Sequence, residues 1–140
     1  MRTPNGDRGA AAVEFGLLLP LVLLIVCGII DFGGVLNAQV SLTQAAREGA
    51  RVAALQDTYD YSEIETRTKD AATSQLVERD NVGVAVDPAA PCPDSDDAVV
   101  EVSYPFEFIT PIGSLATLFG GPGFGNSIDL SATGVMPCET

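Results

Sequence analysis

Residues 8–36 read RGAAAVEFGLLLPLVLLIVCGIIDFGGVL, and this stretch decides how the chain is organised. Residues 15–30 carry no charge, and with residues 32–36 the apolar run is close to the ~20 residues that a membrane-spanning helix needs. A cleavable signal peptide has a shorter apolar core and a small-x-small site. The nearest candidate cleavage site ends at Ala38, but Leu36 occupies the position where a second small residue is needed, so the site fits poorly. We therefore expect a spanning helix over about residues 15–36.

The charges on either side of this segment predict its orientation. Arg2 and Arg8 precede the apolar run, and no basic residue follows it until Arg47. Because basic flanks favour the cytoplasmic side, we expect the N-terminus inside and the C-terminal domain outside. The 140-residue chain has a formal net charge of −12, and residues 37–140 carry five basic against sixteen acidic groups. A chain this acidic is a poor candidate for a nucleic-acid-binding protein, because nucleic acid binds to basic patches.

The helical pattern continues beyond the membrane, through residues 37–55 (NAQVSLTQAAREGARVAAL). Apolar residues recur there at helical spacing. The stripe that we expect to be buried consists of Val40, Ala46, Ala50 and Ala53. No proline lies between Pro20 and Pro88. One helix of roughly 70 Å, at 1.5 Å per residue, is therefore expected over about residues 10–55, with its outer half packed on a small head.

Two residues interrupt the apolar segment. Pro20 cannot donate a hydrogen bond to the Gly16 carbonyl, so we expect a kink or a loosened turn. Asp31 is costly in hydrocarbon and is expected toward the outer face of the membrane. Two roles stay open for Asp31: a carboxylate that reaches interfacial water, or one that contacts a partner helix or assembly protein.

The rest of the chain predicts a small exported α+β head. A second helix is expected over residues 59–80, with four buried positions, Ile64, Ala71, Leu76 and Val77. Strands are expected over residues 81–87, 97–108 and 127–136, which form a three-stranded antiparallel sheet. In the middle strand the apolar positions alternate with polar ones and are Val100, Val102, Tyr104 and Phe106. Pro105 indicates an edge or a bulge.

The connection between the last two strands is apolar and rich in glycine. Residues 110–119 are expected to form a short helix or an apolar loop, and residues 120–126 a loop. Two roles stay open for residues 109–119: packing in the core, which is the usual fate of apolar residues, or an exposed sticky surface for a partner subunit.

The cysteines divide between the two parts of the chain. Cys27 lies in the apolar run, whereas Cys92 and Cys138 lie in the part expected outside, where disulfides persist. A Cys92–Cys138 bond would close a long loop, worth roughly 4 kcal/mol in the chain-entropy model. The alternative is two unpaired thiols.

The inventory of catalytic groups is nearly empty. The chain has no His, which removes the usual general base and metal–histidine sites. The acidic turn with Asp94, Asp96 and Asp97 lacks the glycine and the spacing of a Ca²⁺ loop. We therefore expect no enzyme, no metal site and no cofactor.

The motifs together resemble the TadE-like proteins of tight-adherence (Flp-type) pilus systems. The resemblance is strong over residues 8–54 and rests on four stretches of sequence: residues 8–15 (RGAAAVEF), 18–20 (LLP), 28–33 (GIIDFG) and 45–51 (AAREGAR). It implies a type IV pilin-like minor subunit, or an assembly factor, of an adhesive surface filament. Its expected partners are other pilin-like subunits, the prepilin peptidase, the inner-membrane assembly platform and membrane lipid.

The resemblance also assigns roles to individual residues. The peptidase would cut between Gly9 and Ala10, so that Glu14 becomes the fifth residue and pairs with a neighbour's new N-terminus. The helix motif is carried by Arg47, Glu48, Gly49 and Arg51. The chain then divides into a leader (residues 1–9), a long helix (10–56) and an exported head (57–140).

Two other classes of protein remain as alternatives. An uncleaved single-pass protein would keep residues 1–9 and bind an envelope partner through its acidic head. A secreted enzyme or binding domain, released from a signal peptide, is disfavoured because catalytic groups are missing.

Overall fold

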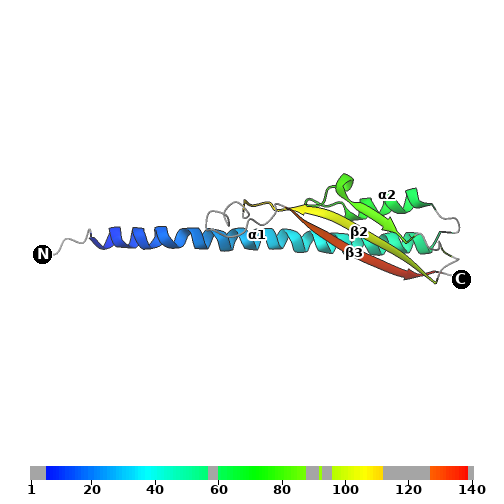
Figure 1. Ribbon diagram of the computed structural model, residues 1–140, viewed down its shortest axis with the longest axis horizontal. Helices are drawn as coiled ribbons and strands as arrows, with labels where there is room; N and C mark the ends of the chain where they lie inside the picture. Colours follow the sequence, from blue (N-terminus) through cyan, green and yellow to red (C-terminus); the bar gives the residue numbers. More distant parts are fainter. Residues whose placement is uncertain (1–5, 57–59, 88–91, 93–95, 112–126, 139–140) are drawn as a thin grey trace. The chain divides into compact units, whose positions relative to one another are not determined.

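The computed structural model describes residues 6–56, 60–87, 92, 96–111 and 127–138 (Figure 1). The elements follow in the order α1 (Gly6–Ala54), α2 (Tyr61–Ala72), a 3₁₀ turn η1 (Arg79–Asn81), β1 (Gly83–Val86), β2 (Asp97–Glu107) and β3 (Ser127–Pro137). This confirms the α+β class with a long N-terminal helix, a second helix and a three-stranded antiparallel sheet.

The chain forms two compact units. The membrane unit is the described part of Met1–Gly33 and Phe108–Gly125, and the head unit is the described part of Gly34–Glu107 and Asn126–Thr140. Helix α1 contributes residues to both. The helix begins at Gly6, four residues before the expected start, and continues without a break through Pro20.

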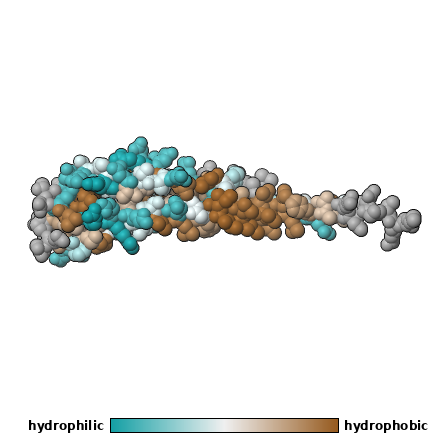
Figure 2. Space-filling view, turned by 180° about the vertical axis from the view of Figure 1, so that it is seen from behind, coloured by the Kyte–Doolittle hydropathy of each residue, from teal (hydrophilic) through white to brown (hydrophobic). Residues whose placement is uncertain are grey.

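In the membrane unit, α1 exposes large apolar side chains on every side. They include Val13, Phe15, Leu17, Leu21, Ile25, Ile29 and Phe32. Figure 2 shows the corresponding apolar surface in brown along α1. Within the part of the chain that the structure describes, α1 is the helix that is long and apolar enough to cross a membrane. An apolar surface of this extent is stable in lipid rather than in water.

Helix α2 is shorter than predicted, because it ends at Ala72 and not near Asp80. At its start, the Asp60 side chain accepts hydrogen bonds from the backbone N–H groups of Ser62 (2.9 Å) and Glu63 (3.4 Å), a typical N-cap. At its end, the backbone N–H and the hydroxyl of Thr73 both donate to the Lys69 carbonyl. Thr73 itself is extended, and the Ser74 hydroxyl then accepts from the Leu76 N–H at 3.4 Å, a local hydrogen bond that competes with a further helical turn.

Of the four positions predicted to be buried in this region, two are buried and two are not, because the helix is shorter than predicted. Ile64 and Val77 are buried, whereas Ala71 and Leu76 are only half-buried. Val77 reaches the core because the chain turns after Ala72: the Ser74 N–H donates to the Val77 carbonyl at 3.2 Å. Within α2 the buried positions are Ile64, Thr68 and Ala72, spaced one helical turn apart.

The sheet has the strand order β1-β2-β3, and both pairs are antiparallel. Strand β2 alternates as predicted, with Ala98, Val100, Val102, Tyr104 and Phe106 buried. Although β2 is central, β1 extends only to the pair Gly83↔Ser103, whereas Pro105 pairs with Asp129 of β3. Pro105 therefore occupies a stretch of β2 with a partner strand on one side only, where a missing N–H is tolerated.

The outer part of α1 lies in the core of the head unit through small residues. The buried positions are Ala38, Leu42, Ala45, Ala46, Ala50, Ala53 and Ala54. The assignment of Val40 to this stripe was wrong, since its side chain is 58% exposed. Gln39 beside it donates from Nε2 to the Ser131 carbonyl of β3 at 2.8 Å.

Two glycines make this close packing possible. A Cβ on Gly49 would collide with the Thr68 hydroxyl of α2 and meet Val100 Cγ1 of β2 at 3.0 Å. A Cβ on Gly134 of β3 would collide with the Ala46 carbonyl and lie 2.8 Å from the Arg47 nitrogen. Backbone atoms cannot give way as a side chain can, so Gly134 lets β3 lie directly on α1.

Candidate assembly and processing surface

The expected processing point lies on the first turns of α1. Gly9, Ala10 and Glu14 are all helical and exposed. An added Cβ on Gly9 would meet nothing within 4 Å. Among the described residues, the exposed Glu14 carboxylate makes no hydrogen bond or ion pair. The structure thus leaves the expected cut site and the carboxylate accessible on one exposed helical segment.

The Asp31 carboxylate accepts hydrogen bonds from residues of its own chain. Neither of the two roles expected for it, contact with interfacial water or with a partner protein, included such bonds. The side chain is 2% exposed. Oδ1 accepts from the backbone N–H groups of Ile109 and Thr110, at 3.0 Å each, and Oδ2 accepts from the Thr110 hydroxyl. Three donors satisfy a carboxylate that would otherwise be costly to bury.

Pro20 lies half-buried on a helix that the structure keeps continuous. Its ring removes one intrahelical hydrogen bond, to the Gly16 carbonyl. On the same helix, Gly16 and Gly33 have no neighbouring atoms within 4 Å of an added Cβ. They leave open helix surface for other chains or lipid.

The AAREGAR motif divides between packing and surface. Ala45, Ala46 and Ala50 are buried with Gly49, whereas Arg47 and Arg51 are exposed. Arg51 makes a bidentate ion pair with Glu48, from Nε to Oε2 at 3.0 Å and from Nη2 to Oε1 at 2.8 Å. Arg47 forms no hydrogen bond or ion pair with the residues that the structure describes.

The Glu48–Arg51 pair changes how both groups titrate. The hydrogen bond from Arg51 is the main cause that lowers the pKa of Glu48, and burial opposes it. The same hydrogen bond raises the pKa of Arg51. Both side chains therefore stay charged across the physiological pH range. Their ion pair lies on a polar face of the outer part of α1.

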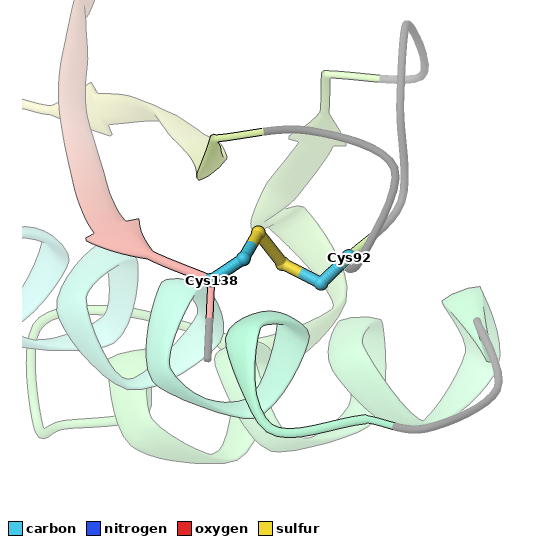
Figure 3. The surroundings of a disulfide bond; sticks show 2 residues. All are labelled: Cys92 and Cys138. Atoms are coloured by element: carbon cyan, nitrogen blue, oxygen red, sulfur yellow. A yellow bond between two sulfur atoms is a disulfide. The ribbon is translucent and has the colours of Figure 1, made fainter. Parts of the chain in front are cut away.

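The head unit is closed by a disulfide between Cys92 and Cys138 (Figure 3). Their Cα atoms are 5.5 Å apart, a usual distance for such a bond. Cys138 follows the last residue of β3, and its N–H donates to the Asp96 carbonyl at 3.0 Å. The bond thus joins the end of β3 to the segment that leads into β2. Cys27 is a free thiol on α1.

Sequence reasoning missed the donors to Asp31 and the role of Gly134. Ile109 and Thr110 are 78 and 79 residues from Asp31 along the chain. A local pattern carries no signal for such a distant contact. No group of three His, Cys, Asp or Glu within the described ranges is placed to hold a metal ion.

An apolar membrane-length helix that continues into the core of a disulfide-bonded head defines a membrane-anchored protein. The family model described as TadE-like protein matches residues 9–51, and this match confirms the family resemblance of the helix. The match covers both the apolar run and the AAREGAR motif. No curated protein and no solved structure gives a significant match.

Proposed function

We propose that the protein is a pilin-like minor subunit, or an assembly factor, of a tight-adherence (Flp-type) pilus. The match to the TadE-like family over residues 9–51 carries this proposal and supports involvement in such a pilus. The exposed apolar surface of α1 supports it independently, because that surface needs lipid or neighbouring helices to cover it.

In this proposal Glu14 sets the register between neighbouring subunits. A carboxylate at the edge of hydrocarbon is costly unless it is paired. Glu14 is exposed and follows Gly9 by five residues. Cleavage after Gly9 creates a new amino group on Ala10, and the amine of one subunit then pairs with Glu14 of a staggered neighbour.

The proposed division of the chain follows from this processing. Residues 1–9 are the cytoplasmic leader, residues 10–56 the packing helix and residues 57–140 the exported head. The span lies at about residues 15–36 in the cytoplasmic membrane, with the N-terminus inside. The prepilin peptidase acts on the cytoplasmic side, and the inner-membrane platform receives the mature subunit.

The role is structural rather than enzymatic. Arg47, Glu48, Gly49 and Arg51 lie on the part of α1 that belongs to the head unit. Two of them, Glu48 and Arg51, pair on the polar face, while Gly49 permits the close approach of α2. In this proposal these residues pack the outer part of α1 into the head.

Substitution of Glu14 tests the proposal. In Glu14→Ala cells we expect normal cleavage and loss of assembled pili, because the peptidase acts before subunits pair. Val13→Ala is the matched control, since Val13 is the exposed neighbour and carries no charge. Normal pili from Glu14→Ala cells would contradict the assigned role. Persistence of residues 1–9 in the mature protein would favour the uncleaved anchored protein instead.

A further inference from the structure

We propose that residues 108–111, which directly follow β2, are a second membrane contact, in which Ile109 lies in the outer interface of the bilayer and Asp31 holds it at that depth. The inference rests on the membrane placement of α1 in the proposed function. It concerns contacts within the membrane unit alone. The occupant of this surface is lipid, at the boundary between headgroups and acyl chains.

Asp31 attaches this segment firmly to the helix. Three hydrogen bonds to its carboxylate come from two consecutive described residues, Ile109 and Thr110. The carboxylate is almost completely buried by this arrangement. Two adjacent backbone N–H groups bound to one carboxylate fix the local path of the chain, so Ile109 cannot move away from α1 without leaving a buried charge unpaired.

The position of Asp31 on α1 sets the depth of the contact. Asp31 precedes the end of the apolar run, at Leu36, by five residues. At 1.5 Å per residue this places Asp31 about 7.5 Å inside the outer end of the span. Interfacial elements are buried ~5–10 Å into the boundary between headgroups and acyl chains. The segment held by Asp31 therefore meets this boundary.

Ile109 is exposed although its backbone is attached to the helix. Its backbone N–H is tied to Asp31, yet 57% of its surface is exposed. On the helix, Phe32 beside Asp31 is also exposed. Two large apolar side chains at this level are unfavourable in water and favourable in lipid.

The charge pattern also favours lipid as the partner. Residues 108–128 form a 21-residue stretch without a charge, while 19% of the whole chain is charged. A stretch of this length would on average hold about four charges at that frequency. The remaining parts of residues 37–140 hold all sixteen acidic groups. Anionic lipid repels acidic residues, so the uncharged residues 108–111 are suited to the bilayer surface.

Single tryptophan substitutions test this contact, because the chain contains no Trp. Three full-length variants, each reconstituted in vesicles of phosphatidylcholine and phosphatidylglycerol, report three positions. Ile109→Trp probes the proposed contact, and Leu21→Trp probes the spanning helix. Val135→Trp is the matched control, because Val135 of β3 is 57% exposed, the same fraction as Ile109. Quenching of the indole fluorescence by brominated lipid and by aqueous iodide is measured for each.

We expect brominated lipid to quench the Ile109→Trp variant about threefold more than the Val135→Trp variant, and iodide to show the reverse order. Lipid quenching of Leu21→Trp without lipid quenching of Ile109→Trp would overturn the proposal and leave the membrane span intact. Protection of the Ile109→Trp variant from both quenchers would also overturn it, since a protein partner would then cover the segment. Absence of lipid quenching in Leu21→Trp would contradict the span itself, and this inference with it.

Removal of the attachment tests the role of Asp31. Combined with Ile109→Trp, Asp31→Ala is expected to reduce lipid quenching at least about twofold, because the segment loses its three hydrogen bonds. Asp129→Ala is the control, since Asp129 is exposed and is the first charge after residues 108–128. Unchanged quenching in the Asp31→Ala variant would overturn the proposed positioning role.

Discussion

The two halves of α1 are one continuous helix but differ in side-chain size and in surroundings. In the membrane unit the helix carries large residues such as Leu17, Leu21 and Ile25, and they are exposed. In the head unit it carries alanines and Gly49, and they are buried under α2 and the sheet. Large side chains suit a helix that lipid surrounds, whereas small ones let neighbouring backbones come close.

This contrast shows that burial and hydrophobicity are separate properties in this chain. The most apolar half of α1 is the exposed half, and the less apolar half forms a core. Matched substitutions in the two halves should therefore change the stability of the head very differently. Each comparison uses the full-length protein in detergent, with thermal unfolding of the head followed by circular dichroism.

The largest difference in the stability of the head is expected between substitution of a cysteine in the head and substitution of the cysteine in the membrane half of α1. Cys138→Ser opens a disulfide with a sequence separation of 46. The chain-entropy model then predicts a loss of about 4 kcal/mol in the free energy of unfolding. Cys27→Ser on the membrane half should change unfolding of the head by less than ~0.5 kcal/mol. Equal stability of the two variants would show that the disulfide does not hold the head together.

The next largest difference in the stability of the head is expected between substitutions of a buried and an exposed leucine of α1. Leu42 is completely buried in the head, whereas Leu21 is 58% exposed on the membrane half. Leu42→Ala should cost about 3 kcal/mol, because it removes buried methyl groups and leaves a cavity. Leu21→Ala should leave unfolding of the head unchanged within ~0.5 kcal/mol. A comparable loss in both would mean that the membrane half also contributes to the head core.

Glycines test the close approach of β3 to α1. Gly134→Ala should destabilise the head by about 2 kcal/mol, since the new Cβ collides with the Ala46 carbonyl. Gly33→Ala is the control on the membrane half, where nothing lies within 4 Å of the added Cβ. A Gly134→Ala protein as stable as the parent would show that the strand does not pack on the helix at this point.

The smallest effect is expected at the surface pair of the outer helix. The pKa of Glu48 is lowered in the folded protein, so its contribution is present above the unfolded pKa near 4.5 and disappears as the pH falls through the lower folded value. Glu48→Gln should lower the melting temperature by ~2 °C or less near neutral pH, and by nothing in strong acid. In an Arg51→Gln background the substitution should have no further effect. A loss that persists in acid would refute the ion-pair explanation.

Much of the architecture could be predicted because its signals are local. The uncharged run predicts the long helix, and the alternation of residues 97–108 predicts β2 and its buried face. The end of α2 was misplaced because the Ser74 hydroxyl accepts from the Leu76 N–H, a local hydrogen bond that competes closely with continued helix.

The errors that remain concern contacts between distant residues. Helical spacing predicts that a buried stripe exists, but α2 and β3 decide which stripe it is, and they leave Val40 outside. The donors to Asp31 come from a segment far along the chain, so its burial has no sequence signature. The prediction of the processing point has a different basis from those for Val40 and Asp31. Gly9, Ala10 and Glu14 were assigned from the family resemblance and not from packing.

The most direct test of the proposed function is the intact mass and N-terminal sequence of the protein extracted from the membranes of its native cells. We predict a mature chain that starts at Ala10, with Glu14 as its fifth residue. A chain that keeps Met1 or Arg2 would contradict processing, and a chain that starts after Ala38 would remove the membrane helix and the account built on it.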